Sequence, residues 1–208
     1  MSAPLQAERD PGGQVGRPRD LSRDSAVLQA VRELLAEEGY QALSVHKVTL
    51  RCGVHVRTIA RRWETKAEMV AAAVLGGDEA LYSENALRAP TGRLDADLRE
   101  LIGRTMRYLA DPATQAALPA LMGEIPVNDK VRAYFERREE EWAAVVRSVL
   151  ERAVESGDAP ERVLGRERIL ARVLAGSAYS LGFSPAPAKD AGLSDELASF
   201  VLAALLAP

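Results

Sequence analysis

Apolar residues recur at intervals of three or four along most of this chain, which is the period of an α-helix. The clearest run extends from Val131 to Ala153, with Arg138 inside the apolar repeat, and it predicts a helix of about seven turns. No segment alternates apolar and polar residues in the way that a half-buried β-strand does. We therefore predict an all-α fold.

Signals for helix ends divide the chain into about nine helices. Ser44, Thr65 and Ser194 are expected N-caps, because a side-chain hydroxyl can accept a hydrogen bond from a free backbone N–H; Glu68 completes a capping box with Thr65. Gly39 is an expected helix end. The predicted helices cover residues 22–39, 44–52, 56–63, 65–81, 94–109, 114–124, 131–155, 161–181 and 193–205.

We expect three parts: an N-terminal arm (1–20) without apolar periodicity, a small helical domain (21–68) and a larger one (69–208). Apolar residues at 47% and charged residues at 27% are typical of a globular protein. The longest apolar stretches, such as Val201 to Ala207, are too short to span a bilayer, and nothing near Met1 resembles a signal peptide. A single cysteine, Cys52, suits a reducing compartment, so we expect a cytoplasmic protein with no membrane partner.

Charge is unevenly distributed along the chain. Residues 1–70 contain 11 Lys and Arg against 9 Asp and Glu, whereas the remainder has an excess of acidic residues. Between Ser44 and Lys66 there are six basic residues, and Glu64 is the only acidic one. This segment is a local basic patch inside a chain whose overall net charge of -3 does not itself predict a polyanion partner, and a solvated helical face is the alternative to a binding surface.

Residues 22–63 have the layout of a helix-turn-helix, with Gly53 in the tight turn before the third helix. The second helix is expected to turn Val45, Val48 and Leu50 inward. In a helix-turn-helix the third helix lies in the DNA major groove. Arg57 and Arg61 are one turn apart on its exposed face, where guanidinium groups suit guanine edges or phosphates.

The segment from Val27 to Met69 resembles the tetracycline-repressor (TetR) family of transcription regulators. The matching residues include Glu37-Glu38-Gly39-Tyr40, Leu43-Ser44-Val45, Cys52-Gly53-Val54, Arg57-Thr58-Ile59 and Thr65-Lys66-Ala67-Glu68-Met69. The chain departs from the family pattern in having Val48-Thr49 for Ile-Ala, His55 for Ser, Arg57 for Gly, and Ala60 for a Tyr that often contacts phosphate. We expect Arg61 and Arg62 to take over such contacts, and the operator sequence is not transferable from relatives.

The resemblance implies that this segment binds a double-stranded DNA operator. The residues predicted to contact base edges are Val56, Arg57 and Arg61. Ser44 and Lys66 stand at helix N-termini, which favour phosphate. The remaining predicted DNA contacts are His46, Thr58, Arg62 and, from the arm, Arg17 and Arg19, for which a tail without a specific role is the alternative.

The resemblance also implies that the later helices bind a small, mostly apolar effector and form a homodimer. The candidate pocket residues are Met106, Leu118, Met122, Glu124, Tyr134, Phe135, Trp142 and Tyr179, with Glu124, Tyr134 or Tyr179 as polar anchors. The candidate dimer residues are Val173, Leu174, Leu181, Phe200, Val201 and Leu205. Ordinary core packing is the alternative for every residue in both sets. The charged run from Arg137 to Glu141 is expected to be a solvated face.

Three other function classes fit less well. His46, Cys52 and His55 are too few for a structural zinc site, so we expect no metal and no cofactor. We find no Gly-rich phosphate loop, no HExxH helix and no catalytic triad, which argues against an enzyme. A helical interaction module that uses the basic patch on an acidic partner remains the main alternative to a ligand-responsive repressor.

Overall fold

The computed structural model describes residues 21–76, 90–183 and 191–207. Within these ranges it contains nine α-helices, one short 3₁₀ helix and no β-strand, so the all-α prediction is confirmed. The α-helices are α1 (Leu21–Ala42), α2 (Val45–Cys52), α3 (Val56–Arg62), α4 (Lys66–Leu75), α5 (Leu94–Ala110), α6 (Pro112–Glu124), α7 (Asp129–Glu155), α8 (Glu167–Gly182) and α9 (Ala191–Leu206), and the 3₁₀ helix is η1 (Glu161–Val163).

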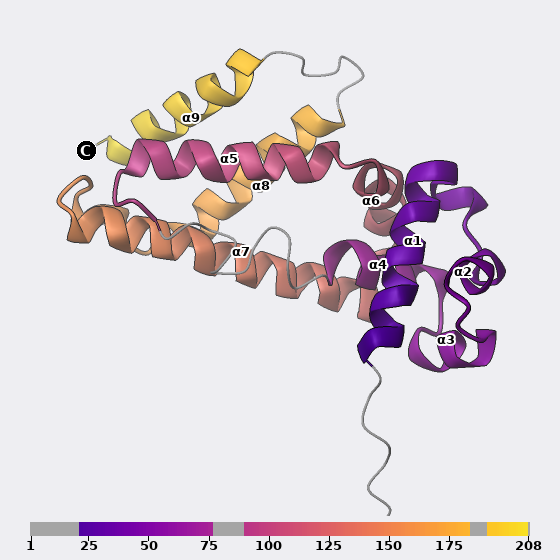
Figure 1. The fold of residues 1–208 in the computed structure, drawn as a ribbon. Coiled ribbons are helices and arrows are strands. Elements are labelled where there is room, and N and C mark those ends of the chain that lie inside the picture. Colours follow the sequence, from indigo (N-terminus) through magenta and orange to yellow (C-terminus); the bar gives the residue numbers. More distant parts are fainter. Residues whose placement is uncertain (1–20, 77–89, 184–190, 208) are drawn as a thin grey trace, which may run out of the picture.

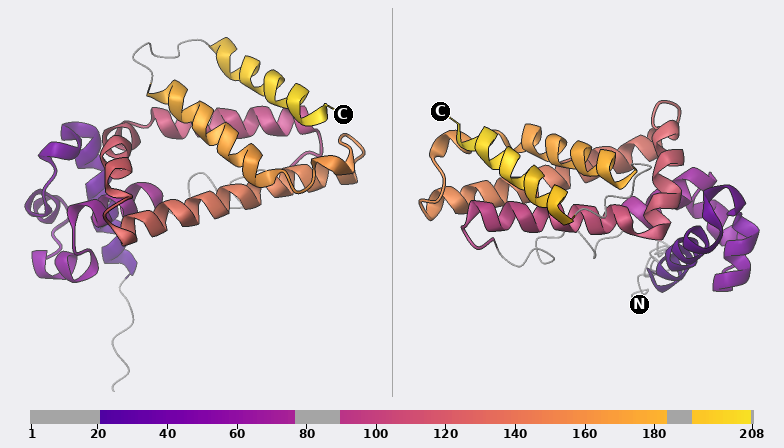
Figure 2. Two further views of the ribbon diagram at one scale, coloured as in Figure 1. Left: turned by 180° about the vertical axis from the view of Figure 1, so that it is seen from behind. Right: turned by 90° about the horizontal axis from the view of Figure 1, so that it is seen from above.

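The helices form an elongated molecule with a small head at one end (Figure 1). The head consists of α1–α3, and the body consists of α5, α7, α8 and α9. Helices α4 and α6 lie between them, where α1 packs against both and α4 also packs against α7. Figure 2 shows α9 along the outer side of α5, with the C-terminal end of the chain at the end of the body far from the head.

Two apolar cores follow this division. The first joins the head to α4 and α6, and the second joins α5, α7, α8 and α9. The side chain of Met106 on α5 packs against both. Every residue of α4 from Ala67 to Leu75 is buried. The head therefore shares its core with the helix that connects it to the body, and the two parts are packed together.

Local signals define the helix ends as predicted. The Ser44 hydroxyl accepts a hydrogen bond from the backbone N–H of Lys47 (3.3 Å). The Thr65 hydroxyl accepts one from the N–H of Glu68 (3.1 Å), and the Glu68 carboxylate reaches back to the N–H of Glu64 (3.0 Å). The capping interactions at both helices are therefore confirmed.

Other expectations were wrong. Leu50 is 71% exposed, because it lies about 200° around α2 from the fully buried Val48, on the face opposite the core. Ser194 does not cap α9, since that helix already begins at Ala191. The eighth helix begins at Glu167 and not at the predicted residue 161, where the short 3₁₀ helix η1 begins instead. Residues 1–20 and the predicted end of the fourth helix, Leu81, lie outside the described residues.

No helix in the described part of the chain is long and apolar enough to cross a membrane.

Gly39 provides a test of the head. Its φ of 81° and ψ of 173° interrupt α1 in a region of backbone space that essentially only glycine adopts. We expect Gly39→Ala to lower the free energy of unfolding by about 1–3 kcal/mol in urea denaturation. Gly123 near the end of α6 is the matched control: a Cβ there meets nothing within 4 Å, so Gly123→Ala should leave stability unchanged or slightly raised. Equal losses would contradict this role of Gly39.

Candidate DNA-binding surface and ligand cavity

The α2–turn–α3 unit is a helix-turn-helix, as predicted. Gly53 ends α2 with a φ of 70°, and the His55 side chain caps α3 by accepting a hydrogen bond from the N–H of Arg57 (3.2 Å). On the inner side, Ile59 and Trp63 are buried in the head core. The cap by His55 was missed from the sequence, although its position just before the third helix is one at which a side-chain acceptor is favoured.

Acidic residues of α1 neutralise much of the predicted basic patch. Arg51 forms ion pairs with Glu33 (3.1 Å) and Glu37 (2.6 Å), and Lys47 pairs with Glu38. The hydrogen bond from Arg51 holds the pKa of Glu37 below its ordinary value. The charge count along residues 44–66 therefore overestimates the exposed positive charge, because the neutralising acids come from an earlier helix.

The arginines of α3 differ in whether an acidic residue of α1 pairs with them. Arg62 forms an ion pair with Asp24 of α1 (3.0 Å). Within the described ranges, Arg57 and Arg61 form no ion pair or side-chain hydrogen bond, and both side chains are exposed. Val56 is 46% exposed beside them at the start of α3. The outer face of α3 thus presents two available guanidinium groups and one apolar side chain.

The other predicted DNA contacts are distributed around this face. His46 is exposed on α2, whereas Ser44 and Thr58 are half-buried. The Lys66 ammonium donates to the carbonyl oxygen of Leu43 (3.0 Å) and lies 4.4 Å from the centre of the Tyr40 ring, and burial lowers its pKa. It is therefore occupied in joining the start of α4 to the end of α1. Arg17 and Arg19 lie outside the described residues.

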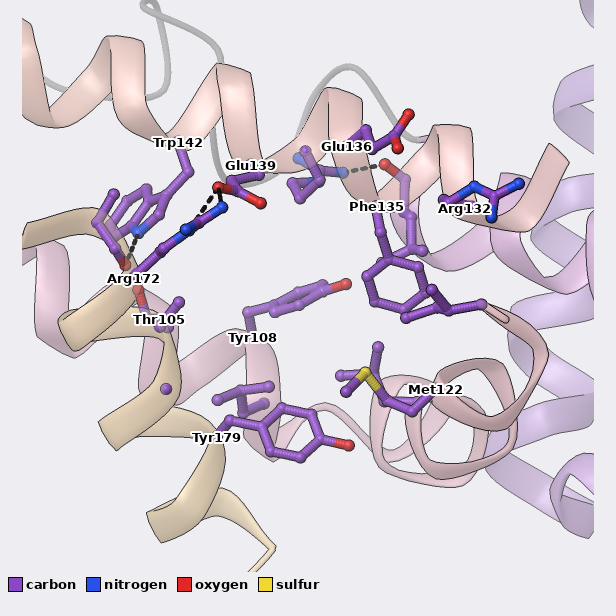
Figure 3. Close-up of a pocket in the computed structure, with 18 residues that line it drawn as sticks. Thr105, Tyr108, Met122, Arg132, Phe135, Glu136, Glu139, Trp142, Arg172 and Tyr179 are labelled. Atoms are coloured by element: carbon purple, nitrogen blue, oxygen red, sulfur yellow. Dashed lines mark hydrogen bonds and ion pairs between the residues drawn. The ribbon is translucent and has the colours of Figure 1, made fainter. Parts of the chain in front are cut away.

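A cavity of about 620 Å³ lies among α5, α6, α7 and α8, beside the end of α4. Figure 3 shows Tyr108, Met122, Phe135 and Tyr179 around its centre. Five of the eight predicted pocket residues line it, namely Leu118, Met122, Phe135, Trp142 and Tyr179. Burial raises the pKa of Tyr179, which favours a protonated hydroxyl group in this wall.

Three predicted pocket residues do not line this cavity. Met106 packs between the two cores, and Tyr134 packs against the first core with the Arg137 guanidinium 5.2 Å from its ring centre. Glu124 lies at the end of α6, where its charge adds to the effect of burial in raising the pKa of Tyr40.

Charged residues in the cavity wall were missed. The cavity wall includes four charged residues of α7, namely Arg132, Glu136, Arg138 and Glu139. The expectation that the run from Arg137 to Glu141 is a solvated face was therefore wrong for Arg138 and Glu139. Arg172 of α8 pairs with Glu139 (2.7 Å), and this ion pair lies beside Trp142 in Figure 3. The position of Arg138 inside the apolar repeat of this helix was the one signal in the sequence, because residues at that spacing share a face.

Comparisons with known proteins identify both parts of the chain. Residues 27–73 match the family model described as bacterial regulatory proteins of the tetR family, and residues 88–201 match the tetracyclin repressor-like C-terminal domain. A DNA-binding transcriptional repressor TetR of Mycobacteroides abscessus is 30% identical over 149 residues, which cover 71% of each chain. The chain belongs to the TetR family.

Solved structures show the same fold. A TetR transcription regulator from Haloarcula marismortui aligns with a TM-score of 0.68 at 18% identity, covering 90% of this chain and 100% of the other. The transcriptional regulator FadR from Bacillus subtilis, solved in complex with stearoyl-CoA, aligns with a TM-score of 0.55 at 17% identity, covering 88% and 97%. As a member of the TetR family, this protein is a DNA-binding transcriptional regulator, as expected from its sequence.

The predicted dimer residues of this TetR-family protein fall into two groups. Val173 is 40% and Phe200 is 72% exposed, on α8 and α9. Leu174, Val201 and Leu205 instead belong to the second core of the protomer, and the side chain of Leu181 is not among those described. Two further apolar side chains that the prediction missed, Ile169 and Leu206, are also exposed on these helices.

The contribution of Lys66 to the stability of this TetR-family head can be tested by denaturation. We expect Lys66→Ala to lower the free energy of unfolding by about 1–3 kcal/mol, because carbonyl groups at the end of α1 lose a charged donor. Lys47→Ala removes the same charge from an exposed ion pair with Glu38 and should cost less than about 1 kcal/mol. Urea denaturation of both variants makes the comparison. A smaller loss for Lys66→Ala than for Lys47→Ala would show that the ammonium group does not stabilise the head.

Proposed function

We propose that this TetR-family regulator is a repressor that binds a palindromic operator as a homodimer and leaves it when a small, mostly apolar effector fills the cavity. The observation that carries the proposal is the position of α4, which is buried between the head and the helices around the cavity. An effector that binds better to an arrangement of the heads unsuited to the operator lowers operator affinity by that difference in binding free energy.

For DNA recognition, α3 enters the major groove with Val56, Arg57 and Arg61 facing base edges. Arg57 and Arg61 suit this role because no carboxylate within the described residues competes for them. The backbone N–H groups at the start of α2, beside Ser44, face a phosphate, with His46 and Thr58 as further contacts. Arg62 and Lys66 have a weaker claim to direct contact, since each already has a partner in the head. Arg17 and Arg19 of the N-terminal arm are the proposed minor-groove contacts.

For the effector, the volume and the apolar and aromatic side chains of the cavity are typical of a small-molecule site. Leu118, Met122, Phe135, Trp142 and Tyr179 are the proposed apolar and aromatic contacts of the effector. The regulator FadR from Bacillus subtilis, which shares the fold, was solved with stearoyl-CoA, a molecule with a long apolar chain. This supports a ligand whose body is mostly apolar.

For assembly, the exposed apolar side chains of α8 and α9 form the proposed dimer surface. Val173 and Phe200 are its central residues, and Ile169 and Leu206 extend it. A two-fold dimer through these helices places two α3 helices for two half-sites of a palindrome. Leu174, Val201 and Leu205 support the surface from within the protomer core.

DNA recognition is tested by selecting binding sites from a random duplex library and titrating the enriched site. Arg57→Ala should weaken binding by about 1–3 kcal/mol and relax the preference at one base pair in each half-site. The matched control is Arg51→Ala, which removes the same charge from a side chain that is already paired with Glu33 and Glu37. Equal weakening by both variants on every sequence would remove Arg57 from base recognition, and no enrichment with folded protein would favour an acidic protein partner instead.

Dimerisation is tested by analytical ultracentrifugation at micromolar concentration. Phe200→Asp should shift the protein towards a monomer, because a carboxylate in an apolar interface loses its hydration without gaining a partner. Val127→Asp is the control, since Val127 is 80% exposed on the loop between α6 and α7 and is not part of α8 or α9. A wild-type monomer, or a dimer unaffected by Phe200→Asp, would contradict the proposed interface.

A further inference from the structure

Three helices supply side chains to the free carbonyl groups at the end of α4. The last carbonyls of a helix have no partner within the helix. Arg32 of α1 donates to the carbonyl oxygen of Ala73 (3.2 Å), Tyr108 of α5 donates to that of Val74 (3.1 Å), and Arg138 of α7 donates to that of Leu75. Consecutive carbonyls are thus held from three directions.

Two of these three donors also belong to the cavity wall. Tyr108 and Arg138 line the cavity, and so does Leu75 itself. Figure 3 shows Tyr108 near the centre of the cavity. The Arg138 side chain is only 16% exposed, so its charge is largely removed from water. The hydrogen bonds that complete α4 are therefore within reach of a molecule in the cavity.

We propose that the effector carries a carboxylate on its apolar body and that this carboxylate binds Arg138 in place of the Leu75 carbonyl. This inference rests on the proposed function of the cavity and names the chemical class of its ligand. A guanidinium bound to a carboxylate gains the attraction between two opposite charges, largely removed from water here, whereas its bond to the neutral carbonyl has a charge on the donor side only. A neutral ligand with a hydroxyl group would compete with the carbonyl on equal terms and gain little.

The other arginines of the wall suit this role less well. Arg172 is already paired with the carboxylate of Glu139 at 2.7 Å. Arg132 pairs with Asp129, and Figure 3 shows its guanidinium directed away from the centre of the cavity. Arg138 also contacts a carboxylate, that of Glu141, but at 3.5 Å and through its other terminal nitrogen, while Nη2 is bound to the neutral carbonyl.

Replacement of the Leu75 carbonyl by a ligand carboxylate as the acceptor for Arg138 connects the chemistry of the ligand to the head. When a carboxylate takes Arg138, the carbonyl of Leu75 loses its donor and the last turn of α4 is less firmly held. The start of the same helix carries Lys66, whose ammonium is bound to the end of α1. Loosening the end of α4 therefore changes the support of the head, and only an anionic ligand causes this exchange.

The test compares decanoate with 1-decanol, which have the same apolar chain, below micellar concentrations. Isothermal titration calorimetry of the full chain should give about tenfold tighter binding of decanoate. Arg138→Gln should abolish this preference, whereas Arg137→Gln, which removes the same charge from the next residue of α7 outside the cavity lining, should retain it. In wild type, amide hydrogen exchange in residues 72–76 should become faster with decanoate than with decanol, which tests the acceptor exchange without any substitution.

The outcomes separate this inference from the proposed function. Equal binding of both probes, or a preference that survives Arg138→Gln, would overturn the carboxylate site and leave an apolar effector cavity in place. Arg138-dependent binding of decanoate without loss of affinity for the selected operator would support the site and overturn effector-induced release. Absence of binding by either probe to folded protein would count against both.

Discussion

The burial of α4 is the constraint on which the rest of the structure depends. Its side chains from Ala67 to Leu75 are enclosed by α1, α6 and α7, and four of these nine residues are alanines, which allow the neighbouring helices to approach closely. A helix enclosed in this way cannot leave its end groups to water, so each end needs partners from the surrounding helices. Those partners come from both the head and the body. Helix α4 therefore joins the packing of the head to that of the body.

The same packing decides which charges remain available at the surface. Helix α1 buries its apolar face against α4 and α6 while its acidic side faces α2 and α3. Lys47, Arg51 and Arg62 are consequently paired, and Arg57 and Arg61 are left exposed on α3. The positive character of the DNA-binding surface is thus set by the geometry of α1 as much as by the basic residues themselves, and a local charge count gives no measure of it.

Features that depend on neighbouring residues could be predicted from the sequence, and features that depend on distant contacts could not. The caps at Ser44 and Thr65 and the turn at Gly53 follow from local backbone chemistry, and all were anticipated. The pairing of Arg172 with Glu139 joins residues on different helices, and no periodic pattern encodes it. Leu50 shows a third case, in which the inward face of the helix was right at Val48 but Leu50 was wrongly added to it, because a single apolar residue says little about orientation.

Helix α7 contacts both ends of α4, and this determines how α4 can move. Near the start of α7, Lys130 pairs with Glu64 (2.8 Å) and Glu68 (3.3 Å) beside the first turn of α4, while Arg138, two turns further along, holds the last turn. A change confined to Arg138 leaves the contacts of Lys130 intact. The C-terminal end of α4 is then held by Arg32 and Tyr108 alone while its start keeps all of its contacts, so the expected motion is a small rotation about the start of α4. A rotation of this kind changes the angle of the head relative to the body, while the core that joins the head to α4 and α6 stays packed.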